Sequence, residues 1–207
     1  MLGKYLSVAA LVSLACVGVA ATQSVKPTTA PATTVASSAT YDIDDVHSSA
    51  LFRVQHAGAG QFWGRFTDVD GTMSFDAANA PTGFDITISI ESVDSGEPKL
   101  DGHLKSPDFF NVKEFPSMTF RSTGLKKGAN GMFEATGDLT MHGVTKPITS
   151  VIEVTGMADM GMGARAGVEA TFSVKRSDFG MNYGVEKGMI GDVVKVIVNL
   201  EGVKAKA

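Results

Sequence analysis

Residues 137–154 read GDLTMHGVTKPITSVIEV, and this segment has the pattern of two β-strands joined by a short turn. From Phe133 to Met141 apolar residues occupy every second position, which predicts a strand with one buried face. The alternation stops at His142-Gly143, where glycine permits the backbone angles of a tight reversal. Apolar residues resume between Ile148 and Val154. We therefore expect a long hairpin, whose apolar face requires a sheet or barrel to close over it.

The same alternation recurs along most of the chain after residue 40. It covers Tyr41–Asp44, Ala50–His56, Phe62–Phe66, Val69–Phe75, Phe84–Ile90, Met118–Ser122, Val168–Val174 and Val194–Leu200. A shift of phase near Asp68-Val69 predicts a bulge or a strand break. The last strand is apolar on both faces, at Val193 and Ile197, which is typical of a central strand. Between Thr155 and Gly167 the chain is rich in Gly and Met and predicts a mobile loop.

One segment, Ser95–Pro116, interrupts the strands. Leu100, His103 and Leu104 have helical spacing, and Pro107 suits the first turn of a second short helix that continues through Phe110. We expect a helical insertion that closes one end of the sheet system. Eight to nine strands with short connections then predict an all-β sandwich or up-and-down barrel.

The chain begins with the pattern of a secretory signal. Residues 1–21 combine the basic Lys4 with an apolar run that ends in small residues, so we expect cleavage after Ala20 or Ala21. An uncleaved anchor is the alternative, because the run approaches the ~20 residues that span a bilayer. Residues 22–40 form a Thr/Ala/Pro/Ser linker with too few large apolar side chains for a core. We expect a periplasmic or secreted protein without a stable transmembrane segment after cleavage.

The domain that follows has no cysteine and is acidic. Cys16, the only cysteine, lies inside the signal, so disulfides cannot stabilise the cleaved protein, and lipidation of Cys16 is left open. Two of the 18 basic residues precede residue 41, which leaves 16 basic against 22 acidic residues and a net charge of −6. This balance argues against a nucleic-acid partner and against electrostatic docking to anionic lipid.

No catalytic motif is apparent. The chain has no Gly-x-Ser-x-Gly elbow, phosphate-binding glycine loop or paired-carboxylate motif. None of the four histidines has the close spacing of a metal pair, so we expect no metal and no cofactor. His47 and His142 fall in turns, where an imidazole usually bonds to backbone. Asp42, Asp44 and Asp45 suggest a solvated loop, and Arg176 and Asp178 are expected to pair or to cap a turn.

Six segments, each weak alone, are specific when taken together. They are Tyr41–Asp44 with His47-Ser48, Phe62–Phe66, His103–Phe110, Pro116–Phe120, Gly137–Pro147 and Arg176–Met181. In this order, from about Tyr41 to Val203, the chain resembles the YceI-like family of secreted, lipocalin-like polyisoprenoid-binding proteins. The resemblance implies an extended eight-stranded antiparallel barrel over residues 41–204, with a short helical insertion. It also implies one long bound apolar chain, such as an isoprenoid tail, and no catalytic set.

The strand phases predict which side chains point into the barrel, where they would be ordinary core by pattern alone, and the resemblance implies that they line an apolar cavity. Its predicted inward side chains are Phe52, Val54, His56, Phe62, Phe66, Phe84, Ile86, Ile88, Phe120, Phe133, Leu139, Phe172 and Val196. His103, Phe109 and Phe110 are expected at the cavity mouth, and His56 or His103 is the candidate contact for a polar head group. Burying ~20 methylene groups would contribute about 16 kcal/mol gross, part of which is lost in ordering the chain.

Together with the strand pattern, the resemblance implies a barrel that binds a polyisoprenoid or an isoprenoid quinone-like lipid for transport, storage or sequestration in the cell envelope. Two alternatives remain at this stage. One is a His-dependent or metal-assisted envelope enzyme, and the other is a partner-binding module whose barrel is filled with side chains. Whether the protein forms a homodimer is left open.

Overall fold

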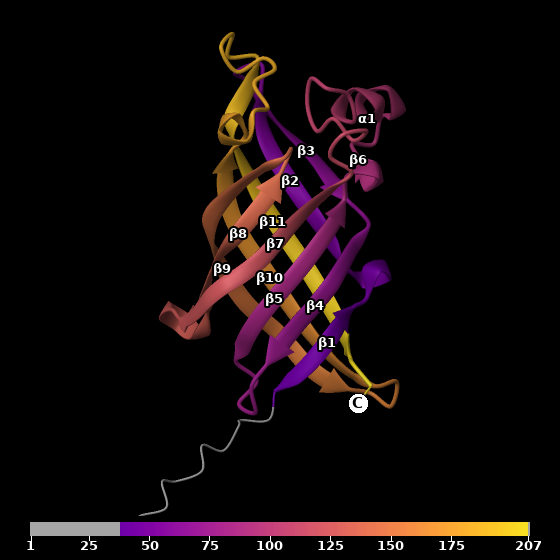
Figure 1. The fold of residues 1–207 in the computed structure, drawn as a ribbon, viewed down its shortest axis with the longest axis vertical. Coiled ribbons are helices and arrows are strands. Elements are labelled where there is room, and N and C mark those ends of the chain that lie inside the picture. Colours follow the sequence, from indigo (N-terminus) through magenta and orange to yellow (C-terminus); the bar gives the residue numbers. More distant parts are fainter. Residues whose placement is uncertain (1–37, 207) are drawn as a thin grey trace, which may run out of the picture. The chain divides into compact units, whose positions relative to one another are not determined.

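The computed structural model describes residues 38–206, most of which lie in antiparallel strands (Figure 1). The strands are β1 (Ala39–Ile43), β2 (Ser49–His56), β3 (Gly60–Phe66), β4 (Val69–Phe75), β5 (Pro81–Ser89), β6 (Val93–Asp94), β7 (Ser117–Lys127), β8 (Phe133–Met141), β9 (Val144–Asp159), β10 (Ala164–Lys175) and β11 (Ile190–Lys204). The helical elements are α1 (Pro98–Leu104) and the 3-10 turns η1 (Asp45–His47), η2 (Ile90–Ser92), η3 (Ala129–Gly131) and η4 (Arg176–Phe179). In the described part no helix is long and apolar enough to span a membrane.

The eleven strands close into a single eight-stranded barrel, because three of the eight positions in the barrel wall are each occupied by two consecutive short strands. β1 and β2 both pair with β11 and are separated by η1. β3 and β4 follow one another along β2 and β1, and β5 and β6 follow along β4 and β3. The barrel closes where β1 pairs with both β4 and β11. The predicted all-β antiparallel barrel is confirmed, as is the strand break near Asp68-Val69.

The hairpin from which the fold was predicted is formed by β8 and β9. Met141 pairs with Val144, so the turn contains only His142 and Gly143, whose φ angles are 53° and 73°. Positive φ at both positions matches the twist of the flanking strands, which is why such turns join hairpins. A side chain at Gly143 would meet the ring of Phe115, so the turn also packs closely against the insertion.

The helical insertion is present, but it holds one helix rather than two. α1 begins with Pro98 in its first turn, and the Glu97 carboxylate accepts the backbone N–H of Lys99. The second helix, predicted from Pro107 to Phe110, is wrong. The amides of Phe109 and Phe110 bond back to Ser106 and Leu104 as successive turns.

The predicted loop at Thr155–Gly167 is also wrong. β9 continues to Asp159 and β10 begins at Ala164, so only residues 160–163 form the tip. Gly161 and Gly163 have positive φ, and they serve this tip rather than a longer loop. β11 is paired along both edges, as expected of a central strand, but Val193 is exposed, so its outer face is not covered.

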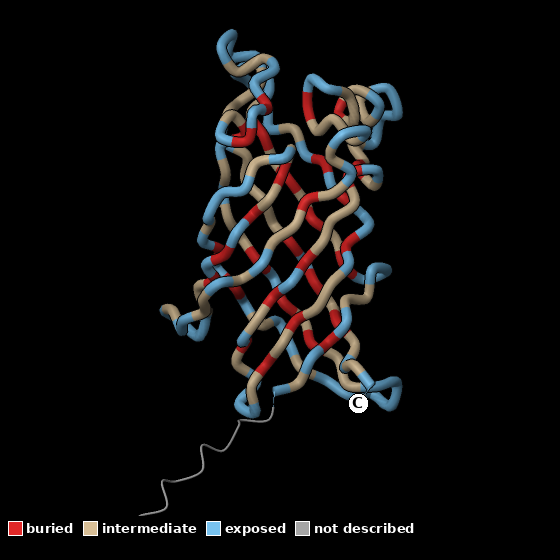
Figure 2. The backbone as a smooth tube through the Cα atoms, in the orientation of Figure 1, coloured by how far each residue is buried: buried red, intermediate tan, exposed pale blue. Residues whose placement is uncertain are grey.

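The two ends of the barrel differ. The mouth end, uppermost in Figure 1, carries the β2–β3 turn, the α1 insertion, the β8–β9 turn and the segment between β10 and β11. At the other, closed end the interior is filled by Tyr41, Met73 and Phe75, and the rings of Tyr41 and Phe75 meet edge to face at 5.6 Å. Figure 2 shows buried and exposed positions alternating along the strands, so the core is the barrel interior.

Candidate ligand-binding cavity

A cavity of about 760 Å³ occupies the barrel interior above the filled end. Its lining residues on β11 run from Ile190 to Leu200, which corresponds to roughly 25 Å along the axis of a barrel with tilted strands. The cavity reaches the surface at the mouth, because the lining residues His56, Tyr183 and Met189 are exposed. A length of 25 Å approaches the ~30 Å hydrocarbon thickness of a bilayer.

Nearly all of the residues that sequence phase directed inward lie on the cavity wall. These are Phe52, Val54, His56, Phe62, Phe66, Phe84, Ile86, Ile88, Phe120, Leu139, Phe172 and Val196, and the expected mouth residues His103, Phe109 and Phe110 also line it. Phe133 is the exception. It lies at the start of β8, near the filled end, and packs half-buried against the core. Whether the lining residues contact a ligand stays a prediction.

Partial exposure inside the barrel reflects the empty space. Phe62, Phe120, Phe172 and Val196 point inward yet are only partly buried, because one side of each borders the cavity rather than other side chains. Met73 and Phe75, which lie at the closed end, are completely buried. The barrel is therefore not filled by its own side chains along its whole length.

Sequence periodicity missed much of the mouth. The missed lining residues there include Leu100, Leu104, Met181, Tyr183, Met189 and Ile190. The helical spacing of Leu100 and Leu104 was visible in the sequence and could have assigned them to the cavity. The segment that contains Met181, Tyr183 and Met189 has neither helical nor strand period, so no local signal marked it.

Polar groups at the mouth are few and mostly paired. His103 Nε2 lies 2.9 Å from Asp108 Oδ2, and its ring meets the rings of Phe109 and Tyr183 edge to face at 4.9 and 5.1 Å. His56 ends β2 at the rim and is exposed. The entrance is therefore surrounded by side chains that can form hydrogen bonds, and the cavity below it is lined by apolar side chains.

Arg176 organises one side of the mouth. Its side chain is only 4% exposed and donates hydrogen bonds to four backbone carbonyls, those of Met181, Tyr183, Ile190 and Gly191. Burial lowers the pKa of its guanidinium, and the nearby charge of Asp192 opposes that shift. The sequence suggested a partner at Asp178 or a turn cap, but the guanidinium instead holds the chain between η4 and β11.

His142 ties three mouth elements together. Its Nδ1 lies 2.9 Å from the carbonyl oxygen of Phe179, so the expected bond to backbone is confirmed. Its ring packs on Phe115 of the insertion with 4.8 Å between ring centres. A carbonyl can only accept, so Nδ1 donates, and Nε2 is left buried without a partner in the described part.

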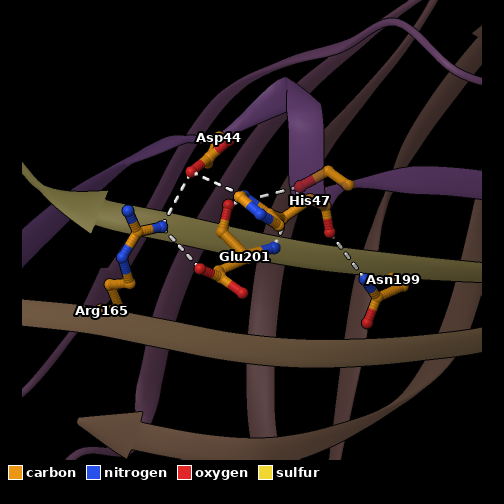
Figure 3. Close-up of polar contacts among 6 residues, drawn as sticks. Asp44, His47, Arg165, Asn199 and Glu201 are labelled. Carbon is orange, nitrogen blue, oxygen red and sulfur yellow. Dashed lines mark hydrogen bonds and ion pairs between the residues drawn. The ribbon is translucent and has the colours of Figure 1, made fainter. Parts of the chain in front are cut away.

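Outside the cavity, one polar cluster has the residue types of a metal site (Figure 3). In the described part, Asp44, His47 and Glu201 are the three side chains close enough to share an ion. Arg165 already bridges the two carboxylates, with Nη1 2.8 Å from Asp44 Oδ2 and 2.6 Å from Glu201 Oε1. The hydrogen bond from Arg165, and then that from His47, hold the pKa of the Asp44 carboxyl below its usual range.

This cluster corrects two expectations. Asp44 does not belong to a solvated loop, because it is half-buried and paired. The His47 imidazole pairs with Asp44 at 3.1 Å instead of bonding to backbone, while the His47 carbonyl accepts the side-chain N–H of Asn199. The cluster lies at the seam of the barrel, by which we mean the place where β1 pairs with β11. Its ion pairs connect side chains from both sides of this seam.

The fold and the cavity define a lipocalin-like antiparallel barrel with an apolar interior open at one end. Residues 41–202 match the model of the YceI-like domain, and the chain belongs to the YceI-like family. Protein YceI of Escherichia coli is 40% identical over 167 residues, which cover 80% of this chain and 86% of that protein.

Solved structures show the same architecture. The YceI protein of Campylobacter jejuni is 30% identical with a TM-score of 0.66, and the match covers 74% of this chain and 90% of that one. A domain from Saccharophagus degradans, described as polyisoprenoid binding, is 18% identical with a TM-score of 0.62. That match covers 80% of this chain and 98% of the domain, and it shows the shared fold alone.

Proposed function

We propose that the barrel binds one long-chain apolar molecule, a polyisoprenoid or an isoprenoid quinone-like lipid, and transports, stores or sequesters it in the cell envelope. The supporting observation is the cavity of about 760 Å³. Of its lining residues within the described part, none is acidic and none is lysine. The fold is shared with the Saccharophagus degradans domain that is described as polyisoprenoid binding.

Burial alone supplies enough free energy for this binding. Each methylene group removed from water contributes about 0.8 kcal/mol, and a preformed apolar cavity takes up a flexible chain without charged contacts. The phenylalanine-rich wall offers a large apolar surface, and methionines such as Met118 and Met141 adapt to chains of different shape. Binding rather than catalysis is therefore the activity we propose.

The ligand is proposed to enter tail first and to leave its polar head at the mouth. His56 and His103 are the head-group contacts of this proposal, because both line the entrance. His56→Ala should weaken binding of a quinone more than binding of a plain alkene, whereas His47→Ala, at a residue that does not line the cavity, should weaken neither. If His56→Ala binds both ligands as wild type does, His56 has no head-group role.

The cellular location is also a proposal. The predicted signal at residues 1–21 and most of the predicted linker at 22–40 lie outside the described residues. Export to the periplasm or beyond would place the barrel where envelope lipids are made available.

The proposal is tested by competition between a fluorescent polyprenol and unlabelled prenols of increasing chain length. Affinity should rise with chain length until the chain fills a cavity of about 25 Å and should then level off. Affinity that does not change with chain length, or an absence of uptake, would contradict lipid binding in the barrel.

A further inference from the structure

The outer face of the barrel beside the mouth carries an unusual group of side chains. Lys195 on β11 pairs with Arg53 on β2, which in turn pairs with Trp63 on β3. On the same face, Val193 of β11 pairs with Lys175 of β10. Because the residues next to each of them along the strands, such as Val54 and Val194, line the cavity, these five side chains point outward. We call these five residues the Trp63 patch.

The apolar members of the patch are open to solvent. Trp63 is 47% exposed and Val193 is 56% exposed. The guanidinium carbon of Arg53 lies 5.6 Å from the centre of the Trp63 ring, a cation–π contact that holds both groups at the surface. Tryptophan beside basic residues suits a membrane interface, where the ring lies at the level of the head groups.

The basic members of the patch have few acidic partners. Within the described part, Arg53, Lys175 and Lys195 form no ion pair, whereas Arg121 and Lys126 on β7 pair with Asp85 and Glu134. Carboxylates near the patch already have partners of their own. Asp94 forms an ion pair with Arg65 at 2.8 Å. Asp192 accepts hydrogen bonds from the backbone and the side chain of Ser177, and the charge of Lys175 contributes to lowering its pKa. The flank is thus locally positive in a domain of net negative charge.

The patch adjoins the entrance of the cavity. The backbone N–H of Ala57, in the β2–β3 turn, donates to the carbonyl of Met189 at 2.7 Å. Met189 lines the cavity and is 51% exposed, so apolar surface continues from the interior onto the rim above β11. A surface that received this flank would lie next to the opening.

We propose that the Trp63 patch docks the barrel onto an anionic lipid bilayer. This goes beyond the proposed function, because it assigns a partner surface rather than a cavity ligand. The negative charge of the whole domain argued against such docking, but the local field of an unpaired basic patch determines the contact. A second copy of the chain fits less well, since a symmetric contact would set the same three cations against each other.

The chain provides its own probe, because Trp63 is its only tryptophan. With vesicles of phosphatidylcholine and phosphatidylglycerol, its emission should shift to the blue and its quenching by iodide should fall. Salt at about 1 M should reverse both changes, since it shortens the Debye length, over which charges attract, to about 3 Å. Vesicles of phosphatidylcholine alone should give a much smaller shift. Lipid entering the cavity cannot mimic the signal, because Trp63 faces away from it.

Variants separate the patch from overall charge. In vesicle sedimentation, R53Q/K195Q should lower partitioning about 25-fold, because each basic residue near an anionic surface contributes about fivefold. The matched control R121Q/K126Q, with the same charge change on β7, should stay within about twofold of wild type.

Equal losses in the two variants, or no partitioning of wild type, would overturn the proposal. So would an emission shift that grows with protein concentration without vesicles. Polyprenol competition is measured without vesicles, so lipid binding and docking can fail independently.

Discussion

At the mouth, one buried guanidinium supports a segment that has no regular structure of its own. The four carbonyls bonded to Arg176 all lie between residues 181 and 191. A lysine has a single nitrogen and cannot reproduce this planar fork. We expect Arg176→Lys to lower the free energy of unfolding by about 2–4 kcal/mol and to expose the mouth segment to protease.

Urea unfolding and limited proteolysis check this prediction. Arg121→Lys is the control, because Arg121 pairs with Asp85 on the exposed outer face. Its unfolding free energy should change by less than about 1 kcal/mol. Equal stability of the two variants would show that the hydrogen bonds of Arg176 contribute little.

The free energy of unfolding should depend on pH through Asp44, which lies at the barrel seam. Its folded-state pKa is lowered by Arg165 and then by His47, so the carboxylate stabilises the fold above its unfolded pKa of ~3.9. That stability is lost as the pH falls through the lower folded-state pKa. Asp44→Asn should therefore be less stable than wild type at neutral pH, and the gap should close as the pH drops below about 4. Chemical unfolding between neutral and acid pH measures the gap, and a gap that stays constant would contradict this account.

At the level of single residues, alternation predicted the direction of a side chain but not its depth in the barrel. Phe133 and Leu139 share one face of β8, yet only Leu139 reaches the cavity. Which end of the barrel is filled depends on contacts such as Tyr41 with Phe75, between residues far apart in sequence. Likewise, the link of Asp44 to Arg165 spans more than a hundred residues and leaves no local pattern.

Among the elements, the β7–β8 pair shows how closely the wall is packed. A side chain at Gly137 would collide with the ring of Phe120 and the carbonyl oxygen of Arg121. We expect Gly137→Ala to cost about 1–3 kcal/mol, because the backbone carbonyl cannot move aside. Gly102, on the open face of α1, has no neighbour within 4 Å of such a side chain. Gly102→Ala should instead stabilise the protein by about 0.5–1 kcal/mol.

Thermal or urea unfolding of the two alanine variants checks the opposite signs. The Gly102 variant controls for the general effect of replacing glycine on the unfolded chain. If Gly137→Ala were also stabilising, the close approach of Phe120 to the β8 backbone would be relaxed in solution.

The elements that were predicted well have strong local periods. The β8–β9 hairpin follows from alternation and from a turn with glycine, and α1 follows from the helical spacing of Leu100, His103 and Leu104. The errors fall where tertiary pairing overrides composition. Glycine and methionine suggested a loop after Thr155, but pairing with β10 extends β9 to Asp159. Near Pro107, bonds back to Leu104 and Ser106 favour turns over a second helix.

The whole molecule is a barrel whose interior is solid at one end and hollow at the other. A large residue placed in the hollow part should block the ligand without unfolding the protein. Val196 lines the cavity and is only half-buried, so Val196→Trp has space to project inward. We expect at least a tenfold loss of polyprenol affinity, since displacing two methylene groups costs about 1.6 kcal/mol.

The neighbouring Ile197→Trp provides the control. Ile197 is not among the residues that line the cavity, so a larger side chain there should leave polyprenol affinity within about twofold of wild type. Equal binding by Val196→Trp and wild type would place the ligand outside the barrel.

Native mass spectrometry of the protein purified without detergent tests the central claim most directly. The account predicts one bound molecule per barrel, released by solvent and identified as a lipid with a long hydrocarbon chain, and a smaller bound fraction for Val196→Trp. A bare mass for the wild type, with no uptake of added polyprenol or isoprenoid quinone, would contradict the claim that the cavity is a lipid site.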